Sequence, residues 1–466
     1  MTTYSMLSEI DAEGRFWLPS QPESEVRGRL NFTPGQRIVL ELSEQLEGCR
    51  QTGRKLPIVL GMLIGGTPLT LLDSFITGAH CGAGGSGSCE VTVNHALIGE
   101  ASELAGQQAF GSCRFGLTCL ENWAGLSPIK TTTSGKKRRT YHAVFRFPEA
   151  PEIAIDELGL EVRLESEFWQ QDVSLDHVQW DHRCFVKLSS ARPRTLHDLD
   201  LLAFDCQNLL SLLVGQPVAM KELCLDPVAC DEPRDSVDRE LHSLFVQRVK
   251  NPRENVYLPE MLLPRPGLGA AFPALLRRWL LRGKRLRTAR NIYFNTVYAN
   301  DLPPEFRFLS LMRVVETYHR CAGRGTYLPK AQYEVLREKM ETGLPQEITG
   351  DLRQSFLSRI KYANEYSLRK RLDLLVRQLP ADLKKRLTNM AGNFVNRLVD
   401  TRNYFTHYDH ELEDKAYRGI DLHWAAERLR IFLGVVFLLD AGVDPDILLE
   451  AIENCWDVKA VLDVEL

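Results

Sequence analysis

The chain has 466 residues, of which 44% are hydrophobic and 25% charged, and this ordinary globular composition excludes a wholly disordered protein. Its 57 basic and 61 acidic residues give a net charge of −4, so any contact with nucleic acid has to come from local basic patches. Eleven cysteines without regular spacing, together with an N-terminus that lacks a charged leader and an apolar core, predict a cytoplasmic protein with reduced thiols.

Residues 1–190 are predicted to form a β-rich domain. Short runs with partial alternation, such as RIVLELSE, YHAVFRFP and LGLEVRLESEF, are separated by Gly, Pro, Asn or Asp. The apolar segment 56–75 contains two prolines, three glycines and an aspartate, which predicts strand–turn–strand rather than a membrane span. We expect 80–89 to be an exposed flexible loop and 131–140 to be a basic hairpin tip or loop.

Residues 191–302 are predicted to form a helical linking or regulatory region. Apolar residues at helical spacing begin near 196, and a Gly-x-Pro stop follows them. The later segment RRWLLRGKRLRTAR is locally very basic and could follow a phosphate backbone. The candidate RNA-binding residues are Arg277, Arg278, Arg282, Lys284, Arg285 and Arg287, with Arg290 beside them. The alternative is a solvated face that pairs with acidic neighbours.

Residues 303–466 are predicted to be almost wholly α-helical. PPEFRFLSLMRVVETYHR opens with prolines, which the first turn of a helix tolerates. Apolar residues three or four apart mark one face of a helix at Leu383, Leu387, Met390, Phe394 and Leu398. The apolar run 431–439 has nine residues, far short of the ~20 that cross a bilayer. The expected fold is therefore α+β, with a β-rich domain followed by an all-α helical bundle.

The stretch DTRNYFTHYDH, residues 400–410, interrupts this apolar periodicity with polar side chains. Arg402 and His407 form the pattern R-x-x-x-x-H, which also occurs at Arg192/His197 and Arg418/His423. Only Arg402 is followed by a polar amide, Asn403, at the end of an amphipathic helix, whereas the other two copies are expected in turns because Pro193 and Gly419 follow their arginines. We therefore take Arg402, Asn403 and His407 as the candidate catalytic residues.

These three residue types suit cleavage of RNA without a metal ion. A histidine can accept or donate the proton when a 2′-hydroxyl attacks the adjacent phosphorus, and an arginine can stabilise the added negative charge. The expected products are a 2′,3′-cyclic phosphate and a 5′-hydroxyl. The alternative is purely structural, with Arg402 and His407 capping carbonyls and pairing with Asp400 or Asp409.

The spacing within the motif raises a geometric problem. Residues five apart on an α-helix point about 140° apart, so Arg402 and His407 would diverge, whereas Asn403 and His407 share a face. Two arrangements would solve it. Either the helix breaks within the motif, or a second subunit completes the site.

Several nearby residues could support this site. Glu316, an acid within an apolar helical stripe, could hold Arg402 or His407, with an exposed helix charge as the alternative. His410 could contact substrate or be a bystander. Tyr408, like Tyr404, could stack on a base or pack in the core.

We predict no cofactor and no metal ion. Cys81 and Cys89 with His80, or Cys113 with Cys119, could be imagined as zinc ligands, but neither pair has the tight C-x-x-C spacing of a structural zinc site. The glycines at 82–87 lack the Lys-Ser/Thr ending of a phosphate loop, which argues against nucleotide hydrolysis.

TRNYFTH in its helical setting resembles the R-N-x-x-x-H signature of HEPN domains. More narrowly, EFRFLSLMRVVETYHR, NEYSLRKRLDLLV and LVDTRNYFTHYD together resemble the ApeA-like HEPN family, and LTLLDSF, NHALIGE and LTCLENWAG recur in that order in the domain that precedes it there. The resemblance covers most of the chain. It implies a bacterial anti-phage, abortive-infection protein whose HEPN domain is a ribonuclease that uses Arg402, Asn403 and His407.

The same resemblance implies partners. HEPN domains typically pair, so we expect a homodimer at least, in which two motifs face each other. The expected substrate is RNA, either transfer RNA or messenger RNA, and the N-terminal domain would sense a phage-encoded trigger or regulate the ribonuclease; no membrane contact is expected. The main rival is a non-catalytic HEPN scaffold that binds nucleic acid or nucleotides, and a second rival is nucleotidyl transfer or hydrolysis on small nucleotides.

Overall fold

The structure is a computed structural model of the whole chain. It describes residues 4–46, 52–81, 87–107, 109–125, 128–135, 140–147, 152–173, 178–228, 240–299, 301–323, 325–389 and 393–466. The chain divides into two compact units, Met1–Leu281 and Arg282–Leu466. The division into 1–190, 191–302 and 303–466 that we expect from the sequence stays a prediction.

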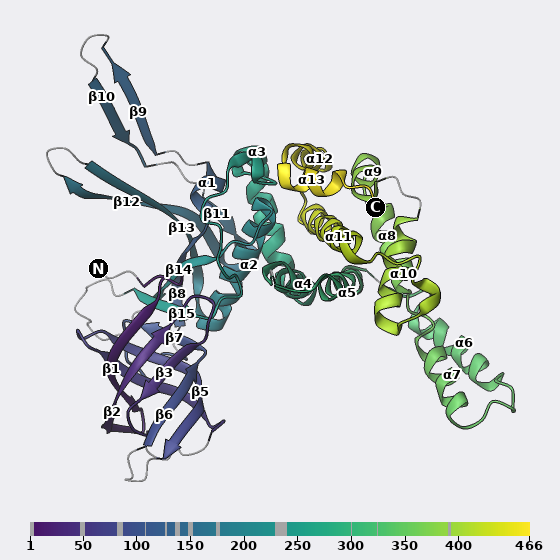
Figure 1. The fold of residues 1–466 in the computed structure, drawn as a ribbon, viewed down its shortest axis with the longest axis horizontal. Coiled ribbons are helices and arrows are strands. Elements are labelled where there is room, and N and C mark those ends of the chain that lie inside the picture. Colours follow the sequence, from purple (N-terminus) through teal and green to yellow (C-terminus); the bar gives the residue numbers. More distant parts are fainter. Residues whose placement is uncertain are drawn as a thin grey trace. The chain divides into compact units, whose positions relative to one another are not determined.

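In the described part of the first unit, thirteen strands form one antiparallel sheet (Figure 1). These strands are β1 (Ile10–Leu18), β2 (Gln21–Phe32), β3 (Ile38–Leu42), β4 (Lys55–Leu63), β5 (Pro68–Cys81), β6 (Gly87–Val93), β7 (His95–Ile98), β8 (Ala109–Leu117), β11 (Glu152–Ile155), β12 (Leu160–Val173), β13 (Val178–Thr195), β14 (Met220–Pro227) and β15 (Leu241–Phe245). β9 (Ile129–Ser134) and β10 (Thr140–Phe145) form a separate two-stranded sheet among the described residues. The β-rich character predicted for this region is confirmed.

Six of these strands close into a barrel. The order β5-β4-β1-β2-β3-β6 returns to its start because β6 also pairs with β5. Closure leaves no edge strand within this ring. Phe16 of β1 fills the interior and is fully buried, and Gly61 of β4 gives its ring room, since a Cβ there would lie 2.6 Å from Cδ1 of Phe16.

The expectation of strand–turn–strand over 56–75 is confirmed, because β4 and β5 form an antiparallel pair there. The loop expected at 80–89 is shorter than predicted, since β5 extends to Cys81 and β6 begins at Gly87; the residues between them lie outside the described part. β9 and β10 form the hairpin expected around 131–140, and residues 136–139 at its turn lie outside the described part.

The region 191–302 is only partly helical. Its helices are α2 (Leu196–Val214), η2 (Leu258–Glu260), α3 (Arg265–Leu268), η3 (Gly269–Ala271) and α4 (Phe272–Tyr298), and the unit also contains α1 (Leu120–Ala124) and η1 (Asp156–Leu158). β14 and β15 lie in this region as well, although the sequence predicts a helical linking or regulatory region there. They are short, and they form because they pair with the distant strands β8 and β7, which local periodicity does not reveal.

A buried polar cluster joins the sheet to α2. His95 of β7 is hydrogen-bonded through Nε2 to the hydroxyl of Ser243 on β15, and its Nδ1 lies 3.8 Å from Oδ2 of Asp200 on α2. Oδ1 of Asp200 is buried without a hydrogen-bond partner in the described part of the chain. Burial lowers the pKa of His95 to about 4 and raises the pKa of Asp200 to about 7.

Asp200→Asn should therefore stabilise the protein at alkaline pH. The folded protein holds the carboxyl proton up to about pH 7, whereas the unfolded chain releases it near the ordinary value of 3.8, so the contribution of this carboxyl to wild-type stability becomes less favourable as pH rises through this window. At about pH 8 the variant should be more stable by on the order of 4 kcal/mol, and the difference should shrink toward pH 4. Urea unfolding of both proteins at pH 4 and pH 8 measures the difference in their free energies of unfolding. A difference that is the same at both pH values would contradict the prediction.

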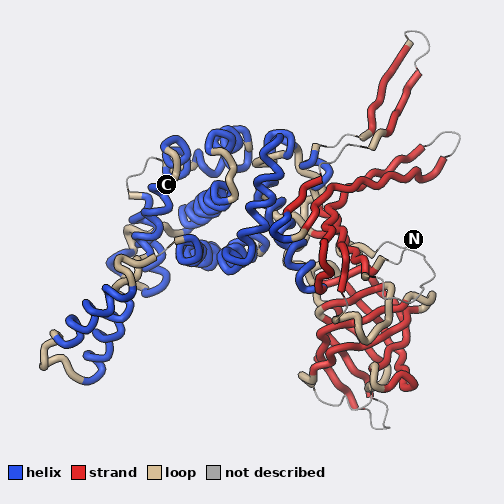
Figure 2. The backbone as a smooth tube through the Cα atoms, turned by 180° about the vertical axis from the view of Figure 1, so that it is seen from behind, coloured by secondary structure: helices blue, strands red, loops and turns tan. Residues whose placement is uncertain are grey.

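The described part of the second unit consists of helices, as Figure 2 shows. They are α5 (Pro304–Ala322), α6 (Lys330–Thr342), α7 (Gly350–Tyr362), α8 (Leu368–Gln378), α9 (Ala381–Thr388), α10 (Phe394–His407), η4 (His410–Leu412), α11 (Gly419–Asp440), α12 (Pro445–Asn454) and α13 (Trp456–Asp463), with the C-terminal part of α4. This confirms the α+β class with an all-α C-terminal region.

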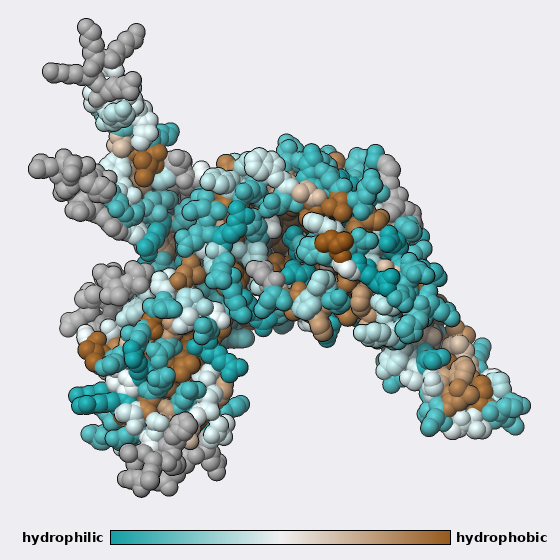
Figure 3. Space-filling model, in the orientation of Figure 1, coloured by the Kyte–Doolittle hydropathy of each residue, from teal (hydrophilic) through white to brown (hydrophobic). Residues whose placement is uncertain are grey.

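α11 forms the centre of this helical unit. Its segment 431–439 is buried almost throughout, so the apolar run seen in the sequence is a core helix that packs against α5. No helix among the described residues is long and apolar enough to cross a membrane. In contrast, α6 and α7 bury only Tyr333 between them, and Figure 3 shows apolar surface gathered over this helix pair.

The single helix expected over 383–398 is wrong. α9 ends at Thr388 because Asn389 adopts a left-handed conformation with φ of 52° and donates its N–H to the carbonyl of Lys385. α10 begins at Phe394, and Met390 lies outside the described residues. The four described residues of the predicted stripe are nevertheless buried, since both helices turn an apolar face inward.

Candidate functional site

The candidate catalytic residues Arg402, Asn403 and His407 lie on the last turns of α10. The helix ends at His407. Tyr408 follows in a left-handed conformation, and its backbone N–H donates a hydrogen bond to the carbonyl of Tyr404. Arg402 and Asn403 are half-buried, and His407 is exposed. The site therefore lies where the helix meets solvent.

α10 runs through the motif without a break, so the first of the two expected arrangements is wrong. On a continuous helix, Asn403 and His407 share a face, and Arg402 points about 140° away from His407. Nη1 of Arg402 donates a hydrogen bond to Oδ1 of Asn403 at 3.1 Å, so the guanidinium is turned toward the face that carries the histidine. No hydrogen bond joins the guanidinium of Arg402 to the imidazole of His407 within the described part of the chain.

The purely structural interpretation of the motif finds no support. Asp400 accepts a hydrogen bond from Arg369 at 3.2 Å, and Asp409 accepts one from the backbone N–H of Glu411 at 3.1 Å. Within the described part of the chain, neither carboxylate pairs with Arg402 or His407, and the imidazole of His407 has no hydrogen bond or ion pair. Its two ring nitrogens are therefore open to a ligand.

α10 is fixed in place by a residue that the sequence did not single out. Thr401 is fully buried; its hydroxyl donates to the carbonyl of Arg397 at 2.6 Å and accepts from the backbone N–H of Tyr417 at 2.9 Å. The guanidinium of Arg397 lies 3.9 Å from the ring centroid of Tyr417. These contacts hold the motif helix against the segment that leads into α11. In the sequence, the only sign of this role of Thr401 is its position next to Arg402.

The residues expected to support the site lie at different places. Glu316, on α5, is half-buried and lies close enough to Arg371 to raise the pKa of that guanidinium, against a larger lowering by burial. Among the described residues no hydrogen bond or ion pair joins Glu316 to Arg402 or His407. That Glu316 holds Arg402 or His407 in position stays a prediction.

The two residues beyond α10 are accessible. The side chain of Tyr408 is 71% exposed, and its ring lies 6.3 Å from that of Tyr404. His410 begins η4, and its Nδ1 lies 3.9 Å from Oε2 of Glu413, the residue that follows η4. Exposure makes core packing of Tyr408 wrong and leaves base stacking as a prediction.

The other two copies of R-x-x-x-x-H have different surroundings. Arg192 lies in β13 rather than in a turn, because the long strand continues to Thr195, and His197 lies in the first turn of α2. Arg418 precedes α11 and forms an ion pair with Glu413, and the ring of His423 lies 5.0 Å from that of Trp424. Neither copy combines an adjacent amide with an unengaged histidine.

The basic residues predicted to bind RNA lie on α4, and several have structural partners. Arg277 forms an ion pair with Glu157, and Arg282 forms one with Asp440. Arg285 donates to the carbonyl of Cys321 at 2.6 Å. Arg290 is buried, whereas Arg278 and Lys284 are exposed and Arg287 is half-buried. Part of this cluster therefore stabilises the fold, and RNA binding by the rest stays a prediction.

The cysteines considered as zinc ligands form no cluster in the described part of the chain. Cys89, Cys113 and Cys119 are buried. Burial raises the pKa of Cys113 well above its ordinary value and that of Cys119 to about 11, which disfavours the thiolate that zinc needs. The side chains of His80 and Cys81 lie outside the described part.

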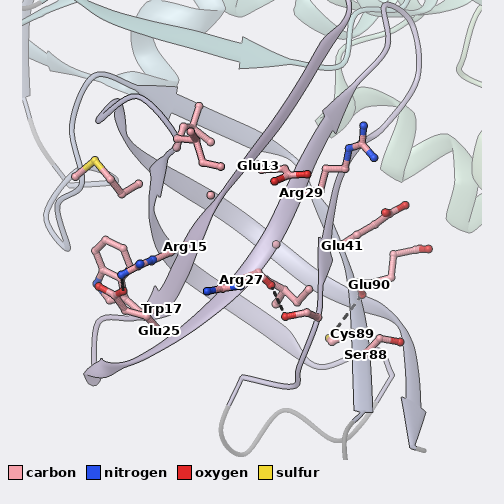
Figure 4. A pocket seen from close by; sticks show the side chains of 17 residues that line it. Glu13, Arg15, Trp17, Glu25, Arg27, Arg29, Glu41, Ser88, Cys89 and Glu90 are labelled. Atoms are coloured by element: carbon pink, nitrogen blue, oxygen red, sulfur yellow. Dashed lines mark hydrogen bonds and ion pairs between the residues drawn. The ribbon is translucent and has the colours of Figure 1, made fainter.

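A hollow of about 940 Å³ lies on the outside of the barrel (Figure 4). Arginines and glutamates alternate along its strands, and Arg15 lies 3.2 Å from Glu25 across β1 and β2. Because the two charge signs are interspersed, this hollow favours neither an anionic nor a cationic ligand. We assign it no role.

Comparisons with known proteins agree with the two-part architecture. A family model described as ApeA N-terminal domain 1 matches residues 11–279, and a model described as Apea-like HEPN matches residues 309–447. No curated protein and no solved structure matches the chain. The second match includes α10 and all three candidate catalytic residues.

Proposed function

The chain belongs to the ApeA-like HEPN family, a family of anti-phage defence proteins, and from this premise we propose that it is an endoribonuclease that acts without a metal ion. One observation carries the proposal: the exposed end of α10 presents an unengaged imidazole, His407, on the same face as Asn403, whose amide binds the guanidinium of Arg402. These are the groups that a phosphodiester cleavage needs.

In the proposed reaction the 2′-hydroxyl of one nucleotide attacks its own 3′-phosphorus. His407 takes the hydroxyl proton, Arg402 stabilises the negative charge on the phosphorane oxygens, and the bond to the 5′-oxygen of the next nucleotide breaks. That oxygen leaves with a proton from an imidazolium or from water. The products are a 2′,3′-cyclic phosphate and a 5′-hydroxyl, so no external water attacks phosphorus in this step.

We propose that two copies of the chain form each active site. The angle of about 140° between Arg402 and His407 on an unbroken helix supports this arrangement, because a second α10 can place its own arginine opposite the histidine. Asn403 would orient the guanidinium. The unit Met1–Leu281 would then sense a phage-encoded trigger and regulate the ribonuclease, and transfer or messenger RNA would be the substrate.

Incubation of the purified protein with total RNA and EDTA tests the proposal. We expect cleavage that survives chelation and yields fragments with cyclic phosphate and 5′-hydroxyl ends. Cleavage that EDTA abolishes would contradict the metal-free mechanism. Tight RNA binding without cleavage, in the presence of lysate from infected cells as a source of the trigger, would favour a non-catalytic scaffold.

A further inference from the structure

A groove beside the candidate active site lies between α8, α9 and the start of α10. Its volume is about 500 Å³. Ten residues line it: Ser367, Arg369, Lys370, Asp373, Val376, Lys384, Thr388, Phe394, Val395 and Asn396. All of them belong to the second unit. The first turn of α10 forms part of the groove wall, and the last turns of the same helix hold the candidate catalytic residues.

The groove carries unpaired positive charge. Its one carboxylate, Asp373, is engaged by Arg377, whose Nη2 lies 2.9 Å from Oδ2. Among the described residues, Lys370 and Lys384 have no carboxylate partner within an ion-pair distance. Two free ammonium groups in one groove attract an anion, and a polyanion most of all.

A polar stripe on α10 connects the groove to His407. Asn396, Asp400, Asn403 and His407 are spaced by four, three and four residues, so they lie within about 60° of one another around the helix axis. The stripe extends about 16 Å along the helix, from the groove wall to the last residue of α10.

Arg369 joins the groove to this stripe. From α8 it donates hydrogen bonds to Oδ1 of Asn396 and to Oδ1 of Asp400, the latter at 3.2 Å. The guanidinium thereby neutralises Asp400, the one carboxylate of the stripe, which would otherwise repel a phosphate near the site. The path from Lys384 to His407 therefore has no unpaired carboxylate among the residues described here.

We propose that this groove, here called the α8–α10 groove, binds the phosphodiester backbone of the RNA strand that His407 cleaves, with Lys370 and Lys384 contacting its phosphates. The inference rests on the proposed function and adds the surface that holds the substrate. Phosphate contacts fix the position of a strand without reading its bases, so the groove sets where the strand lies and leaves sequence preference to other residues.

The double variant Lys370→Gln/Lys384→Gln tests the inference. Binding of a fluorescein-labelled single-stranded RNA is measured in full-length protein that also carries His407→Ala, so that the RNA stays intact. Each lysine that contacts a phosphate of a single strand contributes about 0.7 to the slope of log K against log salt, so the slope should fall by about 1.4. Affinity at low salt should fall on the order of tenfold.

Lys330→Gln/Lys339→Gln is the matched control, because it removes the same charge from α6, where both lysines are exposed and outside the groove. The control should leave the slope unchanged, and both double variants should melt at the wild-type temperature because they replace exposed or half-buried side chains. A groove variant that binds RNA with the control's slope would overturn the inference, while cleavage by the wild type would keep the proposed function intact. A wild type that neither binds nor cleaves RNA would overturn both.

Discussion

Replacing His407 with alanine is expected to reduce the rate of RNA cleavage by a factor of about 10²–10⁴, the usual contribution of a general acid or base. The imidazole is exposed at the end of α10 and has no partner among the described residues, so its removal costs little folding stability. We expect the melting temperature to stay within the error of the wild type. Cleavage rates under single-turnover conditions, together with thermal melting, measure both effects.

His423→Ala and His197→Ala are the matched controls for this substitution. Both histidines stand five residues after an arginine, as His407 does, but neither belongs to the candidate site. Proteins with either control substitution should cleave RNA at the wild-type rate. Loss of cleavage in one of them, with cleavage retained in His407→Ala, would mean that the active site lies at another copy of the motif.

Mixing two inactive variants should restore activity. Arg402→Ala alone should lower the cleavage rate by about 10²–10³, because it removes the cation that we propose stabilises the phosphorane. If each site takes its arginine from one subunit and its histidine from the other, a mixed pair of Arg402→Ala and His407→Ala chains has one intact site. Equal co-expression with random pairing should then give about one quarter of the wild-type activity.

This experiment distinguishes an active site shared by two subunits from an active site formed within one chain. When both groups come from the same chain, every subunit of the mixed pair carries a defect, and no activity returns. The double variant Arg402→Ala/His407→Ala, co-expressed with wild type, is the control for exchange of subunits. Activity of the mixture that stays at the level of the two separate variants would contradict the composite arrangement.

The sequence predicts the two kinds of architecture because their signals are local. Alternation and turn residues mark β4 and β5, and apolar spacing marks the buried faces of α9 and α10. Barrel closure by the β5–β6 pair and the pairing of β14 and β15 with distant strands depend on long-range contacts that no local window contains. The apolar pattern does not reveal the break at Asn389 because apolar residues continue at helical spacing across it.

The candidate site shows the same limit. Arg402, Asn403 and His407 form a short motif, so their shared helix could be predicted from the sequence alone. Arg369 is more than thirty residues away from Asp400 in the sequence and meets it only through the packing of α8 on α10, so no pattern in the chain could reveal that contact. The sequence therefore offers candidate catalytic groups, whose role stays a prediction, but not the residues that position them.

The most direct test of the account is a substrate with one altered atom. Once a cleavage position is mapped, an RNA that carries a single 2′-deoxynucleotide on the 5′ side of that bond is incubated with the protein and EDTA. We expect this bond to resist cleavage while an identical all-ribose strand is cut there to a cyclic phosphate, because the missing hydroxyl is the proposed nucleophile. Equal cleavage of both strands at that bond would contradict it.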